Sequence, residues 1–287
     1  MVSACFVTPS FAPDFERCRL LVESREIMAP RIDHYIVVDR HDLDLFARLK
    51  SATTHVIDSR ELMGNAFVKV PRKGIWLSLR TPPVRGWISQ QIRKLALART
   101  LDVDVVVNVD SDVVLVNPVS VDHFFRDTRL SLFEIDFRDD SVRTWDRVAR
   151  QLLGLGEQGE PNGHVGQMVP WWSSNVRALL ERIEEVAGVD WRIAIARHRT
   201  FSEYQLYGRF CNSLPQHAPG AHFSDDRELV RTTWRYPVSD EASLGALFEG
   251  ATGDTLGVMV HSKDGIAPEL YRAHAARMWD ASRSPAS

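Results

Sequence analysis

Two aspartates follow the most hydrophobic segment of the chain. Asp110 and Asp112 come directly after residues 103–109, in which five of seven positions are valine. In open α/β sheets ligands bind at the carboxyl ends of the strands, and carboxylates there must be solvated, paired or bound to a metal. Two carboxylates at this spacing suit Mg²⁺ or Mn²⁺, which would bridge them to a diphosphate. The alternative is a polar turn between two strands.

His261 and Lys263 follow a second apolar run, residues 256–260. A strand here would deliver the imidazole of His261 to the same sheet edge as the two aspartates, and neutral imidazole is a good ligand for Mn²⁺. Lys263 would then lie close enough to neutralise phosphate charge. The alternative for His261 is a local hydrogen bond at the end of a strand.

Glu203 follows Ser202, which is a good N-cap residue, so Glu203 is predicted in the first turn of a helix. The helix dipole there favours the ionised carboxylate that a general base needs, although acidic residues also occupy first turns for stability alone. Gln91 and Lys94 lie three residues apart on the polar side of a helix predicted from Trp87 to Leu101. Without further information, that side is a solvated helix face.

The chain resembles the A-type (GT-A) glycosyltransferases, which hold a metal and a sugar nucleotide with a D-x-D motif at a strand end. The motifs occur in the order of that family: Phe-Val-Thr-Pro-Ser at 6–10, Val-Asp-Ser-Asp-Val-Val-Leu-Val-Asn-Pro at 109–118, and the late strand ending at His261. Two further segments are similar to a poorly characterised bacterial branch: Gly-Trp-Ile-Ser-Gln-Gln-Ile-Arg-Lys-Leu at 86–95 and Thr-Phe-Ser-Glu-Tyr-Gln-Leu-Tyr-Gly at 200–208.

This resemblance implies the roles of the candidate residues. It implies a Mn²⁺ or Mg²⁺ ion on Asp110, Asp112 and His261, and a nucleotide-diphosphate sugar, with a UDP-sugar expected, on a set of donor-binding residues: Thr8, Ser10, Asp39, Gln91, Lys94, Asp110 and Lys263. Glu203 would deprotonate the hydroxyl of a glycan or another acceptor in a displacement that inverts the anomeric centre. If Glu203 is structural, the stereochemical outcome stays open.

Several other side chains are weaker candidates for the acceptor site. Trp171 and Trp172 could stack on an acceptor sugar, although such pairs are more often half-buried packing. His164 and Gln167 could line the acceptor cleft, and the alternative for both is ordinary loop polarity.

The elements that must position these residues have the pattern of an α/β protein. Short β-branched runs alternate with segments of helical periodicity, which predicts a Rossmann-type, mostly parallel central sheet flanked by helices, like that of the GT-A enzymes. Residues 64–86 contain so many glycines and prolines that we assign no element there. We expect a single catalytic domain over residues 1–287, with a nucleotide-binding half at 1–118 and an acceptor-binding half at 119–287.

Composition narrows the class of protein further. The 35 lysines and arginines against 38 aspartates and glutamates give a net charge of −3, which argues against nucleic acid as a partner. Three widely spaced cysteines fit reduced thiols, and we expect a cytoplasmic protein. The N-terminus lacks a signal-like segment and no window approaches the ~20 apolar residues of a membrane span, while peripheral membrane contact is left open.

Two other functions compete with sugar transfer. Asp110-Ser111-Asp112-Val113-Val114 also fits the nucleophile motif of the haloacid-dehalogenase-type phosphatases, with Asp110 as nucleophile. That motif normally opens its domain, whereas about a hundred residues of α/β pattern precede it here, which argues against a phosphatase. A non-catalytic nucleotide-sugar-binding protein would need the same ligands.

Overall fold

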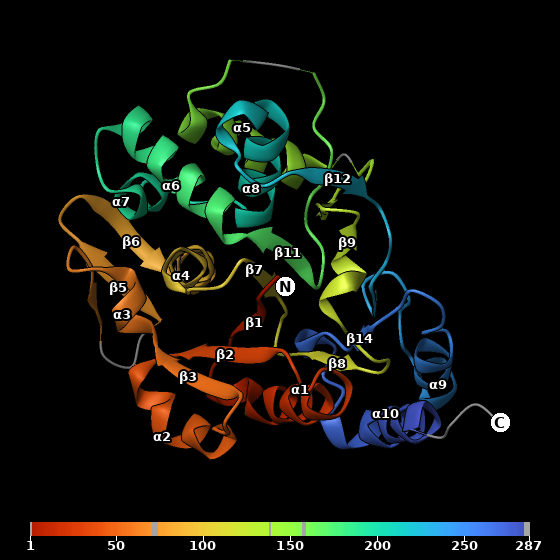
Figure 1. The fold of residues 1–287 in the computed structure, drawn as a ribbon. Helices are drawn as coiled ribbons and strands as arrows, with labels where there is room; N and C mark the ends of the chain where they lie inside the picture. The colour runs from red at the N-terminus through yellow and green to blue at the C-terminus, as the bar shows by residue number, and fades with distance from the viewer. Residues whose placement is uncertain (1, 71–73, 138, 157–158, 284–287) are drawn as a thin grey trace. The chain divides into compact units, whose positions relative to one another are not determined.

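The computed structural model describes residues 2–70, 74–137, 139–156 and 159–283, in which helices and strands alternate along most of the chain (Figure 1). The largest sheet has five strands, in the spatial order β11 (Val169–Trp172), β7 (Val105–Asn108), β1 (Ala4–Pro9), β2 (Asp33–Val38) and β3 (Thr54–Asp58). β1 and β2 run parallel, with Val7 opposite Tyr35. The predicted α/β fold with a mostly parallel central sheet flanked by helices is confirmed.

The chain forms two compact units, which we describe separately. Unit 1 comprises Met1–Ala4, Asp58–Val107 and Phe124–Asp226, and unit 2 comprises Cys5–Ile57, Asn108–His123 and Arg227–Ser287. Each unit therefore takes residues from both sides of residue 118. The division into a nucleotide-binding and an acceptor-binding half stays a prediction.

In unit 2, an apolar face of one helix packs against the central sheet. Helix α1 (Phe15–Met28) buries Phe15 and Cys18 against Ile36 and Val38 of β2. Phe46, from the short helix α2 (Leu43–Phe46), meets the ring of Phe15 edge-on at 5.2 Å. This cluster fixes β2 and the helix that follows β1, and so fixes the strand ends at which Ser10 and Asp39 lie.

A second sheet of unit 2 has the strand order β13 (Val230–Thr232), β14 (Gly257–Met259) and β8 (Val113–Leu115). β14 pairs antiparallel with β8, so that Met259 lies opposite Val113. Helices α9 (Glu241–Glu249) and α10 (Pro268–Arg283) complete the unit, and Figure 1 shows α10 beside α1. The indole of Trp279 in α10 donates to the carbonyl oxygen of Leu115 at 2.8 Å. The strand predicted at residues 256–260 is confirmed by β14, whereas its antiparallel pairing with β8 was not predicted.

Unit 1 is built around helices that pack on one another (Figure 1): α4 (Gly86–Thr100), α5 (Asp140–Leu153), α6 (Ser173–Ala187), α7 (Trp191–Ala196) and α8 (Glu203–Ser213). The alternative that the polar side of α4 is a solvated face is excluded, because Gln91 and Lys94 are only 2% and 6% exposed. Gly154 and Gly188 end α5 and α6 with left-handed φ angles of +68° and +63°, which glycine adopts without strain.

Two small sheets complete unit 1. The first has the order β12 (His222–Asp225), β10 (Arg129–Phe133) and β9 (Phe125–Arg126), with β10 parallel to β12 and antiparallel to β9. The second lies in the region to which no element was assigned: β4 (Val68–Lys69), β5 (Ile75–Ser78) and β6 (Thr81–Arg85) form an antiparallel sheet after the short helix α3 (Ser59–Met63). Pro82 and Pro83 lie in β6, an edge strand whose pairing with β5 is irregular, and both features are typical of strands that contain proline.

None of the helices in the described part of the chain is both long and apolar enough to cross a bilayer.

Candidate functional site

In unit 2, Asp110-Ser111-Asp112, here called the acidic triplet, connects β7 to β8. Asp110 is half-buried, and Asp112 is only 7% exposed. The pairing of β8 with β14 continues beyond the strands, because the amide of Val260 donates to the carbonyl oxygen of Asp112 at 3.2 Å. The amide of Ser262 donates to Oδ2 of the same residue at 3.0 Å. The segment on both sides of His261 is thus hydrogen-bonded to Asp112.

The electrostatics around the acidic triplet show an excess of negative charge. Burial, and after it the charge of Asp110, raise the pKa of Asp112 to about 7, although the hydrogen bond from Ser262 acts to lower it. The pKa of Asp14 is also raised by burial, while Arg17 and His261 act to lower it. A cation at Asp110 and Asp112 would relieve the repulsion between them.

The residues present fit a divalent cation that is shared with an exogenous anion. Carboxylates are the ligands that Mg²⁺ prefers, and this ion is usually held by one or two of them together with substrate phosphates and water. Within the described ranges, no three His, Cys, Asp or Glu side chains are grouped so that they could hold a metal by themselves. The imidazole of His261 packs instead against the indole of Trp234, with ring centroids 5.4 Å apart. Its role as a third ligand stays a prediction.

The other predicted donor-binding residues of unit 2 lie at the ends of strands. The hydroxyl of Thr8 is fully buried, donates to the carbonyl oxygen of Val109 at 2.7 Å and accepts from Nε2 of His34 at 2.8 Å. Ser10 is also buried, whereas Asp39 is half-buried and Lys263 is exposed. Among these, Asp39 and Lys263 have the greatest access to solvent.

In unit 1, three residues that were predicted separately come together. The amide of Glu203 donates to Oε1 of Gln91 at 2.9 Å. Nζ of Lys94 lies 3.2 Å from Oε1 of Glu203, and both side chains are nearly inaccessible to solvent, at 7% and 5%. The same Nζ donates to the hydroxyl of Tyr204 at 3.0 Å. The structure therefore joins α4 to the start of α8 through one buried polar cluster.

The N-terminus of α8 has the predicted cap. The hydroxyl of Ser202 accepts from the amide of Gln205 at 3.3 Å, and Glu203 is the first residue of the helix. Both the helix terminus and the ion pair with Lys94 favour the ionised form of Glu203. The ion pair also engages one carboxylate oxygen. Whether Glu203 acts as a base stays a prediction.

The weaker acceptor candidates differ in their surroundings. Trp171 is fully buried and stacks on Tyr207 with ring centroids 5.3 Å apart, and His164 and Gln167 are also buried. Trp172 is half-buried. Of the four side chains, Trp172 alone is not buried.

Sequence reasoning missed a buried carboxylate in unit 1. Asp146 of α5 is 3% exposed and accepts from Nε of Arg150 at 2.6 Å and from Nε of Arg209 at 2.7 Å. Asp146 and Arg150 stand four residues apart, a spacing that brings side chains together on a helix and was the available signal. No sequence pattern predicts the contact of Arg209 with Asp146, because Arg209 belongs to another helix, α8.

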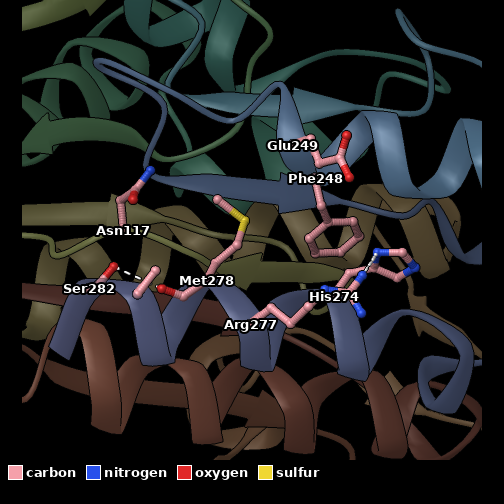
Figure 2. Close-up of a pocket in the computed structure, with 8 residues that line it drawn as sticks. Asn117, Phe248, Glu249, His274, Arg277, Met278 and Ser282 are labelled. Carbon is pink, nitrogen blue, oxygen red and sulfur yellow. Dashed lines mark hydrogen bonds between the residues drawn. The ribbon is translucent and has the colours of Figure 1, made fainter. Parts of the chain in front are cut away.

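A cavity of about 350 Å³ in unit 2 contains none of the predicted site residues. It lies between α9 and α10, where Phe248 faces Met278 and His274 (Figure 2). Arg277 donates to Nδ1 of His274 at 2.6 Å, so the imidazole offers its Nε2–H to Oε1 of Glu241 at 2.8 Å.

Comparison with known proteins places the chain in a family. A model of DUF6492, described as a family of unknown function, matches residues 3–230. The chain belongs to this family. The segment that matches the DUF6492 model contains the acidic triplet and Glu203, whereas His261 and Lys263 lie outside it. A search of curated proteins found no match.

Solved structures give distant likenesses to this member of the DUF6492 family. The apo form of mouse xyloside xylosyltransferase 1 is 11% identical, with a TM-score of 0.48, over 93% of this chain and 100% of that chain. An active-site mutant of LgtC is 13% identical, with a TM-score of 0.46, over 98% of this chain and 97% of that chain. At these values, neither likeness establishes a shared reaction.

Proposed function

We propose that this protein is a metal-dependent glycosyltransferase that moves a sugar from a nucleotide-diphosphate donor to a hydroxyl acceptor. The observation that supports it most is the mutually repelling pair of half-buried Asp110 and buried Asp112 at the end of a buried strand. Such a pair is costly without a cation and is suited to hold one together with a diphosphate. The resemblance of the motifs to GT-A enzymes points to the same chemistry.

Each candidate residue then has a defined task. Asp110 and Asp112 would hold Mn²⁺ or Mg²⁺, with His261 as a further ligand, and the ion would offset the charge of the departing diphosphate. Lys263 would approach the phosphates, since it is exposed and follows the segment that Asp112 holds. Asp39 and Ser10 would contact the nucleoside. Glu203 would accept the proton of the acceptor hydroxyl, which leads to inversion at the anomeric centre.

Thermal unfolding in the presence of nucleotides tests the donor and metal parts of the proposal. UDP with Mn²⁺ should raise the melting temperature, because a ligand that binds the folded state stabilises it. UDP with EDTA should not. Asp112→Asn should abolish the shift, and Asp44→Asn, which changes an exposed carboxylate of the same unit, should preserve it. A panel of GDP, ADP, CDP and dTDP covers other bases. A rise in melting temperature that does not depend on Mn²⁺, or no rise with any of these nucleotides, contradicts the proposal.

Product analysis separates the competing functions. Release of UDP from a UDP-sugar, or transfer of the sugar to an acceptor, supports a glycosyltransferase. Release of phosphate from p-nitrophenyl phosphate supports a phosphatase. Glu203→Gln should leave the nucleotide-dependent thermal shift in place and abolish transfer. If the wild-type chain binds nucleotide sugars without turnover of any of them, it is a binding protein.

A further inference from the structure

A second cavity, in unit 1, combines an aromatic wall with polar side chains. Its volume is about 300 Å³, and its walls include Trp172 at the end of β11, Ser174 and Arg177 of α6, Asp104 before β7, and Thr128 before β10. This volume is at the lower end of the range of small-molecule sites. Of the residues considered for sugar transfer, Trp172, a weaker candidate for the acceptor site, lines it, whereas none of those to which the proposed function assigns a task does.

The indole of Trp172 is held rigidly although it is half-buried. Its backbone amide donates to the hydroxyl of Tyr207 at 2.9 Å, and its ring N–H donates to the carbonyl oxygen of Ala221 at 3.0 Å. The edge of Phe125 meets it at 5.5 Å between ring centroids. A Cβ on Gly220 would lie only 2.3 Å from Cδ1 of the indole, so the ring packs directly on this glycine.

The glycine under the indole is itself fixed in place. The amide of Gly220 donates to Oδ1 of Asn175 at 2.6 Å, and Nδ2 of Asn175 donates back to the carbonyl oxygen of Gly220 at 2.9 Å. An aromatic face fixed in this way needs no ordering when a ligand arrives, and pre-organisation of this kind favours binding.

The polar groups around the indole retain hydrogen-bonding capacity. Oδ2 of Asp104 accepts from the amide and the hydroxyl of Ser3, at 2.8 and 2.9 Å. Within the ranges that the structure covers, Oδ1 of Asp104 and the side chains of Thr128, Ser174 and Arg177 make no intramolecular hydrogen bond. They present a carboxylate acceptor, guanidinium donors and two hydroxyls to the same cavity.

The charges of this cavity nearly cancel. Arg177 is close enough to Asp104 to help hold the pKa of that carboxyl below its usual range, after the larger effect of the hydrogen bonds from Ser3. Paired opposite charges give no strong attraction for a phosphate or an amine. They do serve hydroxyl groups well, because each hydroxyl can donate to the carboxylate or accept from the guanidinium.

We propose that this cavity is a carbohydrate-binding site, in which the C–H face of a neutral pyranose ring stacks on Trp172 and its hydroxyls bond to Asp104 and Arg177. This inference is independent of the proposed sugar transfer and holds whether or not the chain is an enzyme. A nucleobase would also stack on an indole, but it carries no hydroxyl group that could donate to the carboxylate of Asp104 or accept from the guanidinium of Arg177.

Saturation-transfer NMR on the full chain tests the site, since it detects weak binding. The probes are cellobiose, maltose, chitobiose and xylobiose, with uridine as the competing class. At least one disaccharide should receive saturation at its ring C–H protons. Trp172→Ala should abolish the signal, and Arg177→Gln should weaken the affinity about tenfold, the cost of a lost hydrogen bond to a charged group. Trp87→Ala removes an indole that is 47% exposed elsewhere in unit 1 and should change nothing.

Gly220→Ala guards against a folding defect in Trp172→Ala. The added Cβ displaces the indole without deleting it, so Gly220→Ala should also weaken disaccharide binding. Trp172→Phe should retain part of the binding. Circular dichroism confirms the fold of each variant. The proposal is overturned if no disaccharide gives a signal, if uridine alone does, or if the disaccharide signal survives in Trp172→Ala, Gly220→Ala and Arg177→Gln.

Discussion

Lys94 and Glu203 form a buried ion pair, and each charge depends on the other. Both side chains are nearly inaccessible to solvent, and the two charged groups lie 3.2 Å apart. An isolated charge at such a position is strongly unfavourable, whereas a paired and hydrogen-bonded one is tolerated. The hydroxyl of Tyr204 and the amide of Gln91 complete the cluster.

Removal of Lys94 alone should therefore destabilise the protein. Lys94→Met leaves the carboxylate of Glu203 buried without its partner, and we expect a loss of about 3–5 kcal/mol in the free energy of unfolding. In the double variant Lys94→Met/Glu203→Gln, part of that loss should be recovered, with a coupling energy of about 0.5–3 kcal/mol. Urea denaturation of Lys94→Met, of Glu203→Gln and of the double variant measures the three changes in the free energy of unfolding. Strictly additive effects would show that the pair is not coupled.

A matched control is Lys50→Met, which changes an exposed lysine. It should alter stability by no more than about 0.5 kcal/mol. A loss similar to that of Lys94→Met would mean that the substitution itself, and not the buried pair, causes the effect.

The candidate residues could be predicted from the sequence more readily than the residues to which they are hydrogen-bonded. The acidic triplet was singled out because a strongly apolar segment precedes it, and the cap at Ser202 because of its residue type. The bond between Ser262 and Asp112 joins residues that are 150 positions apart, and the bond between Lys94 and Tyr204 joins residues 110 positions apart. Only the folded sheet and helices determine such contacts, so Lys94 was assigned to the donor and not to Glu203.

At the scale of elements, prediction succeeded where one periodicity ran without interruption. The helix predicted from Trp87 to Leu101 agrees with α4 (Gly86–Thr100) to within one residue at each end. The strands β4, β5 and β6 were missed because the glycines and prolines of this region were interpreted as turn signals. Proline is nevertheless compatible with an edge strand such as β6. The sequence does not state where in a sheet a strand will lie.

Helix α8 offers a test of one element, because its cap holds the turn that carries Glu203. Ser202→Ala removes the hydroxyl that accepts from the amide of Gln205. We expect a loss of about 1 kcal/mol in the free energy of unfolding. Ser213→Ala at the other end of the same helix makes the same chemical change without a cap, and it should have little effect. Equal losses in both variants would show that the cap does not stabilise α8.

At the scale of the whole molecule, two neutral histidines link stability to pH. Burial lowers the pKa of His34 to about 3 and that of His222 to about 4. Their hydrogen bonds fit neutral rings, since His34 donates to Thr8 and Nδ1 of His222 donates to the carbonyl oxygen of Leu130. In the unfolded chain both would titrate near the ordinary value of about 6.5.

The protein should therefore lose stability as the pH falls from about 6.5 to 4. In this window the unfolded chain binds protons on both histidines and the folded chain does not, at a cost of up to about 1.4 kcal/mol per pH unit for each. Asp112 acts in the opposite direction, because its raised pKa lets the folded state bind a proton first. Urea denaturation from pH 7 to pH 5 measures the net slope. His222→Gln should flatten it, whatever its effect at pH 7, and an unchanged slope would contradict this assignment.

The paired prolines of β6 have a consequence for how copies of this protein meet one another in concentrated solution. Pro82 and Pro83 lie in an outer strand of their sheet and lack N–H groups. Because successive residues direct their backbone groups to opposite edges of a strand, one of these prolines leaves a donor missing at the outer edge, which disfavours pairing with a strand from another molecule. Replacing these prolines with valine or threonine would make the outer edge of β6 a template for aggregation.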